Sequence, residues 1–484
     1  MNTDASIDVA PETSSDPGSR TGPLIALLVC AAFVVILNET IMSVALPDLM
    51  KEFSVPATTA QWLTTAFLLT MAVVIPVSGW LLIRLPLRTV FVLAMGSFTL
   101  GTLVAATAPV FGALVAGRVV QAVGTALMMP LLMTTILNVV PAHRRGRMMG
   151  IVSIVISVAP AIGPTISGVV LDQLTWRWMF WLVLPIAVIA LAAGAVWVRN
   201  VTEPAPAPLD VVSVVLSALA FGGLIYGLSS IGESATGHTP VPVWIPLVVG
   251  GVTLVVFVRR QLVLRDRALL DLRAFGTPSF SVAVLLVAVS MMALFGTLIL
   301  LPIYLQSALE LSTLATGLML LPGGLAMGLL APVVGALFDR VGPRPLVAPG
   351  AVIACIALWG MTRFGIDTGR GTVIAAHVLL SIGLALMFTP LLTSALGSLP
   401  HALYSHGSAI VGTVQQVAGA AGTALFVTVM TRTTAQSLED GVEPLTGVAD
   451  GVHAALLWGG IISAAAVVLA FFVGRPRAIE DPSS

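Results

Sequence analysis

The sequence has very little charge for its length. Only 9% of its 484 residues are charged, whereas a soluble domain carries roughly 25%, so a water-facing surface of this size is excluded. Hydrocarbon must surround most of the chain, where every backbone N–H and C=O needs a partner, which leaves helices or closed barrels. Barrel strands show short alternating patterns. The long unbroken apolar runs found here predict an all-α integral membrane protein instead.

Lysine and cysteine are also scarce. Lys51 is the only lysine, and the formal net charge is +0, so the chain has no overall attraction for nucleic acid. Cys30 and Cys355 both lie in apolar runs, which argues against a disulfide framework and predicts two buried structural thiols. The sequence shows no phosphate-binding loop, metal-ligand cluster or nucleophile triad. We therefore expect no enzyme, no bound metal and no cofactor.

Fourteen apolar segments have about the ~20 residues that a helix needs to cross a hydrocarbon core. They lie near residues 23–47, 58–82, 88–108, 111–137, 146–171, 178–198, 209–231, 242–261, 278–305, 313–337, 345–365, 371–396, 408–431 and 453–474. Residues 1–22 are polar and lack the basic start of a signal peptide. We expect them, and residues 475–484, to form cytoplasmic tails, the first of them disordered.

Basic residues in alternate loops predict the orientation. With the N-terminus in the cytoplasm, sixteen arginines fall on the inner side and five basic residues on the outer side, a clear positive-inside bias. The inner set is Arg20, Arg84, Arg88, Arg144, Arg145, Arg147, Arg199, Arg259, Arg260, Arg265, Arg267, Arg273, Arg340, Arg344, Arg475 and Arg477; the outer set is Lys51, Arg177, Arg363, Arg370 and Arg432. Both termini are therefore predicted to be cytoplasmic.

An internal repeat supports the number of spans. Residues 76–88, after the second span, share six of thirteen positions with residues 332–344, after the tenth, at a constant displacement of 256 residues. Two six-helix halves, 23–198 and 278–474, joined by two inserted helices and a cytoplasmic linker in 199–277, give this spacing. Parallel halves related by an axis along the membrane normal are typical of rocker-type transporters.

The repeated loop resembles a family signature. Residues 335–344 are similar to the loop motif of the major facilitator superfamily, and the chain after its tail resembles that superfamily's fourteen-helix drug:proton antiporter family. The resemblance implies that the loop residues hold helices together at the cytoplasmic face while the halves rock. In the first loop Ile83 replaces the acid and Pro86 the second glycine. The motif residues are Gly79, Arg84, Arg88, Gly335, Asp339, Arg340 and Arg344.

Arg118 lies inside the predicted fourth span, about two helical turns from its start. Residues 114–124 resemble the superfamily's membrane-embedded arginine motif. Independently of that resemblance, a guanidinium at this depth costs several kcal/mol, so it should face the bundle interior and meet a partner. Gln121 lies one turn further on the same face. The alternative is an outer-leaflet arginine that snorkels to the interface.

The fifth span combines small residues with prolines. It resembles the antiporter motif of drug exporters, and that resemblance implies transport in the export direction. Small residues let two helices approach closely, and prolines weaken a helix locally, so the segment could act as a deformable seam between halves; a plain packing interface is the alternative. The motif residues are Gly150, Pro160, Gly163, Pro164 and Gly168.

The first span carries an unusual version of the exporter family's first-helix motif. Residues 37–47 resemble that motif, but Asn38 stands at the usual carboxylate position and Glu39 supplies a carboxylate one residue later, as the resemblance suggests for some lincomycin-resistance-type members. Neighbouring helical residues point ~100° apart. Glu39 is the only acid deep inside a predicted span, where low dielectric favours a neutral carboxyl. It is a candidate proton carrier; the alternative is a structural hydrogen bond.

The sequence therefore predicts a proton-coupled exporter of hydrophobic antibiotics that works by alternating access in the cytoplasmic membrane. Its partners would be a small hydrophobic substrate, protons and the lipid bilayer, and it would act as a monomer driven by the proton gradient. Glu39 and Arg118 are the candidate coupling residues. A dedicated exporter of one metabolite or envelope lipid, or a non-transporting receptor or scaffold, are the alternatives. The predicted substrate cavity comprises Asn38, Trp62, Gln121, Tyr304, Gln306 and Gln415, several of which could equally be ordinary packing residues.

Overall fold

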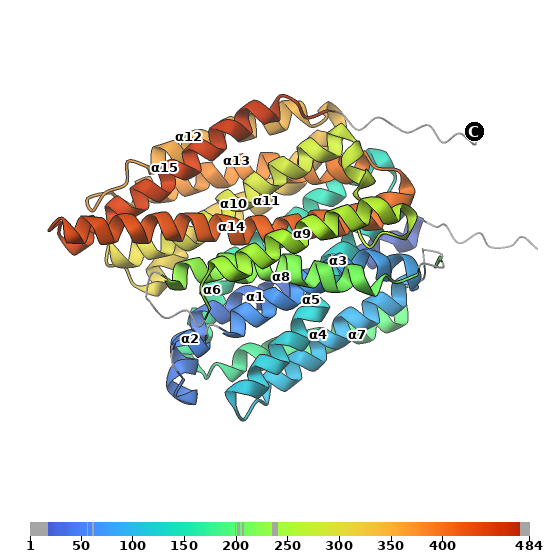
Figure 1. The fold of residues 1–484 in the computed structure, drawn as a ribbon, viewed down its shortest axis with the longest axis horizontal. Helices are drawn as coiled ribbons and strands as arrows, with labels where there is room; N and C mark the ends of the chain where they lie inside the picture. Colours follow the sequence, from blue (N-terminus) through green and yellow to red (C-terminus); the bar gives the residue numbers. More distant parts are fainter. Residues whose placement is uncertain are drawn as a thin grey trace, which may run out of the picture.

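The computed structural model describes residues 18–55, 57–60, 62–198, 200, 204–205, 208–234 and 241–474. These ranges form fifteen α-helices, of which fourteen are long and apolar enough to cross a membrane (Figure 1). The predicted all-α membrane fold with fourteen spans is therefore confirmed. Of the two predicted tails, residues 1–17 and 475–484 lie outside the described residues, and the first helix begins at Gly18.

Six long helices precede the inserted pair, and six follow it. The first six and a short helix, α2, are α1 (Gly18–Phe53), α2 (Ala57–Ala60), α3 (Trp62–Arg84), α4 (Leu87–Ala106), α5 (Phe111–Val139), α6 (Arg145–Gln173) and α7 (Arg177–Trp197). The inserted pair is α8 (Val211–Ser234) and α9 (Trp244–Leu264). The last six are α10 (Pro278–Ser307), α11 (Thr313–Val341), α12 (Arg344–Met361), α13 (Arg370–Gly397), α14 (Tyr404–Glu439) and α15 (Pro444–Ala470).

The two sets of six helices pack by the same scheme. In the first set α4 packs on α5 and α7, and α1 packs on α5, α6 and α7. At the equivalent places of the second set, α12 packs on α13 and α15, and α10 packs on α13, α14 and α15. The repeat seen in the sequence is thus also a repeat of helix packing, and we call the two sets the N-half and the C-half.

Two equivalent helix pairs join the halves. α6 of the N-half packs along α11 of the C-half, and α3 packs on α14. The inserted helix α8 contacts both α3 and α14, so it covers that seam from the side, while α9 packs on α8. α1 begins and α15 ends at the same face of the molecule, at the right of Figure 1. We call this face the termini face.

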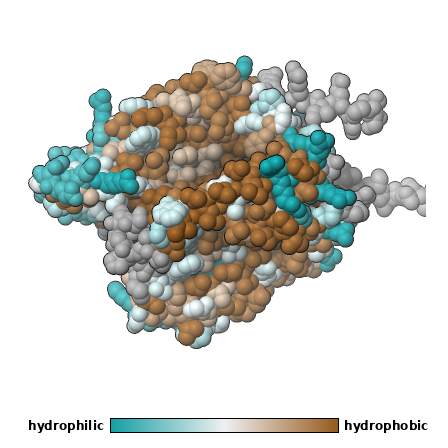
Figure 2. All heavy atoms as spheres, viewed as in Figure 1, coloured by the Kyte–Doolittle hydropathy of each residue, from teal (hydrophilic) through white to brown (hydrophobic). Residues whose placement is uncertain are grey.

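The outer surface of the bundle is largely apolar. Figure 2 shows a broad hydrophobic face, with hydrophilic atoms gathered toward its two ends. Cys30 is exposed on this surface and Cys355 is partly exposed, so the prediction of two buried thiols was wrong. An apolar run predicts that a helix is surrounded by hydrocarbon or protein, but it does not say which face of the helix is turned outward.

Candidate functional site

Arg118 lies in the interior of the N-half, 1% exposed. Its Nη1 donates hydrogen bonds to Oδ1 of Asn38 in α1 (3.1 Å) and to Oε1 of Gln121, one turn further along α5 (3.0 Å). Its guanidinium carbon lies 4.1 Å from the ring centroid of Phe67 in α3, which is a cation–π contact. The side chain thus faces inward with partners, as expected, and does not snorkel.

The hydrogen bonds around Arg118 continue into α4, and each group in the chain donates to the next. Nε2 of Gln121 donates to Oγ1 of Thr102 (2.8 Å), and Thr102 donates to the carbonyl oxygen of Phe98 (2.7 Å). A guanidinium only donates, so the amides of Asn38 and Gln121 must turn their oxygens toward Arg118. Nδ2 of Asn38 and Nε of Arg118 are buried donors that have no hydrogen-bond partner among the described residues.

Thr102 was not predicted from the sequence, and a close approach of two helices brings it into the site. A Cβ added at Gly101 in α4 would lie 2.6 Å from the carbonyl oxygen of Gly117 in α5, and one at Gly117 would lie 2.8 Å from the backbone nitrogen of Ala105. Only glycine allows this distance, and it places Thr102 within reach of Gln121. The spacing of these small residues was the available signal.

Glu39 lies beside this network but outside it. Its side chain is partly buried, and within the part of the chain that the structure describes it makes no hydrogen bond or ion pair. Arg118 is near enough to act on it electrostatically. Asn38, its neighbour in α1, points toward Arg118 instead, as the ~100° step between adjacent helical residues requires. The role of Glu39 as a proton carrier remains a prediction.

The other predicted cavity residues lie apart from Arg118. Trp62 is 43% exposed and stacks on Tyr226 of α8, with ring centroids 6.2 Å apart. Tyr304 is buried, donates to the carbonyl oxygen of Gly365 (2.7 Å) and stacks on a phenylalanine ring. Gln306 is exposed. Gln415 is partly buried, and its Nε2 has no partner among the described residues.

The glycines predicted as an antiporter motif differ in their surroundings. A Cβ at Gly150 would overlap the carbonyl oxygen of Ala331 and lie 2.9 Å from Cα of Pro332, both in α11. At Gly163 a Cβ would overlap the side chain of Thr40 in α1, but at Gly168 it would meet nothing within 4 Å. Pro160 lies on the same helix, α6, and the side chain of Pro164 is outside the described residues. Of these glycines, Gly150 lies against the backbone of α11 in the other half, near the start of α6, whereas Gly163 lies against α1 of the same half.

Asp339 of α11 joins the C-half to the start of α6 in the N-half. Its Oδ1 accepts from the backbone N–H of Gly146 (2.9 Å) and its Oδ2 from that of Arg147 (3.1 Å), in the first turn of α6. A carboxylate at a helix N-terminus satisfies free backbone donors and interacts favourably with the helix dipole. Gly335, one turn earlier in α11, lies so close to Gly146 that a Cβ would overlap its carbonyl oxygen.

The remaining loop-motif residues have mixed surroundings. A Cβ at Gly79 in α3 would lie 3.2 Å from the carbonyl oxygen of Ser405 in α14. Nε of Arg344 donates to the carbonyl oxygen of Val473 (3.1 Å). The side chains of three further motif members are exposed, namely Arg84, Arg88 and Arg340. The first loop thus brings α3 close to α14 through a glycine, whereas the second binds α6 through a carboxylate.

Further polar contacts close the bundle at the termini face. Each joins a residue near the termini-face end of an N-half helix to one near the same end of a C-half helix. They run from Thr134 to Ser408 (3.2 Å), from Thr389 to Ser153 (2.8 Å) and from Nη1 of Arg145 to the hydroxyl of Tyr404 (3.0 Å). Together with Asp339 they hold the two halves against each other on this side.

Comparisons with known proteins agree with this architecture. The family model described as Major Facilitator Superfamily matches residues 28–423. The chain is 43% identical to the lincomycin resistance protein LmrB of Listeria monocytogenes, over 95% of this chain and 98% of that protein. It is 40% identical to the protein of the same name from Bacillus subtilis, over 94% and 96% of the two chains.

Solved structures share the fold at low sequence identity. A human organic anion transporter superposes with a TM-score of 0.68 at 14% identity, covering 93% of this chain and 99% of that one. A proton:xylose symporter superposes with a TM-score of 0.64 at 14% identity, covering 95% and 97%. The fourteen spans, the repeated packing of the halves and the family match lead to one conclusion. The chain is a membrane transporter, not an enzyme, and it belongs to the major facilitator superfamily.

Proposed function

We propose that the protein exports hydrophobic antibiotics across the cytoplasmic membrane in exchange for protons, as a monomer with both termini in the cytoplasm. The names of its relatives support antibiotics as substrates, because two proteins that are 40% identical or more are lincomycin resistance proteins. The arginine bias supports the orientation, since sixteen arginines fall in the segments of the sequence that alternate on the cytoplasmic side and five basic residues fall in the others.

The observation that carries the proposal is a buried positive charge beside an acid that does not neutralise it directly. Arg118 is held by the neutral amide oxygens of Asn38 and Gln121, and Glu39 is close enough to interact but forms no ion pair. Binding or release of a proton at Glu39 would therefore change the net charge around Arg118 by one unit. A proton-coupled transporter needs a group whose charge changes in this way.

The energy of that change can be compared with that of the hydrogen bonds that join the halves at the termini face. At the upper end of the ~4–6 Å range over which neighbouring charges commonly shift each other's protonation, two unit charges interact by about 3 kcal/mol at an effective dielectric constant of ~20. One hydrogen bond to a charged group is worth about 1.5–3 kcal/mol, and Asp339 makes two such bonds to α6. A change at Glu39 is thus comparable to one of the bonds that hold the termini face closed.

The experiment is a susceptibility panel in a host that lacks its own drug pumps. Cells expressing the protein should tolerate higher concentrations of lincomycin and of hydrophobic antibiotics than cells with an empty vector. Arg118→Ala should reach the membrane at the same level and lose this resistance, and Arg118→Lys should lose most of it because an ammonium cannot hold both amides from one planar group. Arg432→Ala is the matched control, because Arg432 is an exposed arginine near the end of α14 that lies away from the termini face.

An unchanged susceptibility to every compound would reject drug export. Accumulation of a cellular metabolite in a deletion strain would then support a dedicated exporter. Full resistance in Arg118→Ala would remove the arginine from the mechanism while leaving export itself in place.

A further inference from the structure

The last turns of α9 have two different faces. Phe257, Arg260 and Gln261 lie on the side that packs into the protein, where Phe257 and Gln261 are each 1% exposed. Arg259, Leu262 and Val263 lie on the opposite side at the spacing i, i+3, i+4, which is one face of a helix. Leu262 is 57% exposed, Val263 is 74% exposed, and the side chain of Arg259 is exposed as well.

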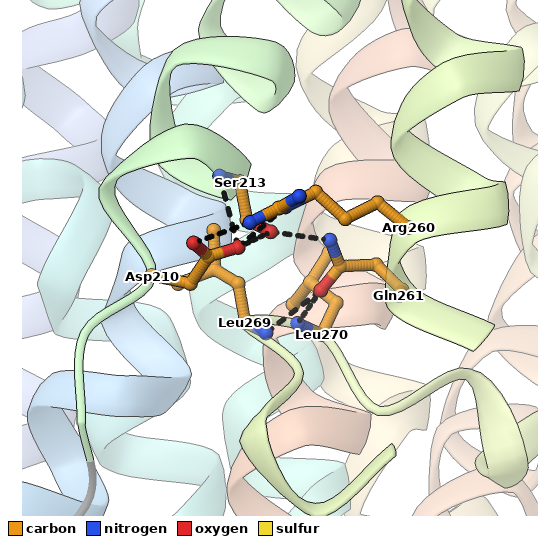
Figure 3. Close-up of polar contacts among 6 residues, drawn as sticks. All are labelled: Asp210, Ser213, Arg260, Gln261, Leu269 and Leu270. Atoms are coloured by element: carbon orange, nitrogen blue, oxygen red, sulfur yellow. Dashed lines mark hydrogen bonds and ion pairs between the residues drawn. The ribbon is translucent and has the colours of Figure 1, made fainter. Parts of the chain in front are cut away.

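The inward face holds the segments before and after the inserted pair (Figure 3). Arg260 donates from Nε (2.7 Å) and Nη2 (2.9 Å) to Asp210, which precedes α8. Gln261 accepts from the backbone N–H of Leu269 (2.7 Å) and of Leu270 (3.3 Å), which lead into α10. The carbonyl oxygen of Leu269 in turn contacts His406 of α14. The end of α9 therefore fixes the inserted pair to the C-half.

The outward face continues as an apolar stripe along α9. Val252, Val255 and Val256 continue the spacing of Arg259 toward the middle of the span, and they are 59%, 69% and 47% exposed. Arg259 is the charged member of this stripe, so it lies on the lipid-facing side one to two turns before the helix ends at Leu264. An arginine at such a place extends its guanidinium along the helix to the headgroup region.

Two further arginines stand just beyond the end of α9. Arg265 adopts a positive φ of 48°, a conformation that a residue with a Cβ rarely takes, and the short helix η2 (Arg265–Arg267) ends at Arg267. Both side chains are exposed. Within the described part of the chain, the guanidinium groups of Arg259, Arg265 and Arg267 make no hydrogen bond or ion pair. Figure 2 shows hydrophilic atoms at this end of α9, next to the hydrophobic face.

We propose that these three arginines bind the phosphate of an anionic phospholipid in the leaflet at the termini face, with an acyl chain along the valine stripe. The charge is complementary: Arg260 is neutralised by Asp210 on the inward face, and the rest of residues 259–267 contains three arginines and one aspartate. The three free guanidinium groups belong to residues at the termini-face end of the apolar stripe, as a molecule with a charged head and an apolar tail requires. Clusters of basic residues at the end of a membrane helix attract anionic lipids in this way.

The site has a consequence for the transporter because the other face of the same turns holds Asp210 and the backbone of residues 269–270. A lipid bound on the outward face anchors α9 at the membrane surface, and α8 with it. The inserted pair then covers the seam between α3 and α14 from a fixed position relative to the C-half.

The test measures lipid binding to the purified full-length protein in detergent by native mass spectrometry. Phosphatidylglycerol should bind at lower concentration than phosphatidylcholine with the same acyl chains. The triple variant Arg259→Gln, Arg265→Gln and Arg267→Gln should lose about 100-fold in apparent affinity for phosphatidylglycerol and keep its weak binding of phosphatidylcholine. The control variant removes the same number of charges at the end of the molecule away from the termini face. It carries Arg363→Gln, Arg370→Gln and Arg432→Gln, and it should bind both lipids as the wild type does.

Two results would overturn the proposal. Equal affinity of the wild type for the two lipids would show that the headgroup charge is not recognised, and this comparison needs no variant to fold. Inorganic phosphate that displaces phosphatidylglycerol at low millimolar concentration would show a site for free anions in place of a lipid site.

Discussion

Gly150 and Gly168 lie in the same helix, but of the two only Gly150 has another helix where an added methyl group would lie. A Cβ at Gly150 would overlap the carbonyl oxygen of Ala331 and lie 2.9 Å from Cα of Pro332, whereas a Cβ at Gly168 meets nothing within 4 Å. Backbone atoms cannot rotate away as the end of a flexible side chain can. Gly150→Ala must therefore push α6 and α11 apart, and Gly168→Ala should not.

The size of the effect follows from the position of the contact. Overpacking in a well-packed interface costs about 1–3 kcal/mol. Gly150 lies one turn after Gly146, which donates to Asp339, so separation of the halves at the termini face relieves the strain. If the strain acts on the closed conformation alone, Gly150→Ala shifts the equilibrium toward the open conformation by about 5- to 150-fold.

Spin labels can measure this shift. Thr89 and Pro345 are exposed at the equivalent starts of α4 and α12, one in each half, and both native cysteines can be replaced by serine. Gly150→Ala should lengthen the distance between labels at these sites and slow drug efflux. Gly168→Ala should match the parent protein in both measurements. A Gly150→Ala protein with the parent distance and parent efflux would refute the packing argument.

Three further predictions concern separate parts of the molecule. Gln121→Leu removes an acceptor of the buried Arg118 as well as the donor to Thr102, whereas Thr102→Val leaves both acceptors of Arg118 in place, so Gln121→Leu should lower thermal stability and efflux more; equal effects would contradict the network. The hydrogen bonds from Arg260, followed by those of Ser213, lower the pKa of Asp210 from 3.8 to about 2. A lowered pKa contributes stability above the ordinary carboxyl pKa that is lost only as the pH falls toward the lowered value, so Asp210→Asn should reduce the melting temperature equally at ~pH 5.5 and ~pH 8. Reporter fusions at residues 1 and 484 should both lie in the cytoplasm, and fusions on opposite faces would refute the topology.

Much of the fold could be predicted from the sequence because hydrocarbon imposes strong rules. Long apolar runs must be helices, and the constant 256-residue displacement indicated two equivalent halves. Helix ends were less predictable. The span expected at 408–431 belongs to α14, which runs from Tyr404 to Glu439, because polar residues can continue a helix into water. α1 likewise continues to Phe53, beyond the predicted end at residue 47.

The site was predictable only as far as single helices allow. Arg118 and Gln121 are one turn apart, so their shared face followed from helix geometry. The contact of Arg118 with Asn38 depends on how α1 is placed against α5, and the contact of Gln121 with Thr102 depends on the close approach of α4. The buried Gln261 was missed because it stands next to loop arginines and looks like part of a solvated helix end.

Glu39 is the residue that we propose to couple transport to protons. The most direct measurement is substrate movement in proteoliposomes, with and without an imposed pH gradient. Glu39→Gln should abolish gradient-driven movement but keep exchange of labelled for unlabelled substrate, because a neutral side chain can still allow the halves to rock. Glu39→Asp should keep partial gradient-driven transport, and Glu439→Gln, an exposed glutamate, should behave as the wild type. If Glu39→Gln responds to the gradient as strongly as the wild type, the proton is carried elsewhere and the account is wrong.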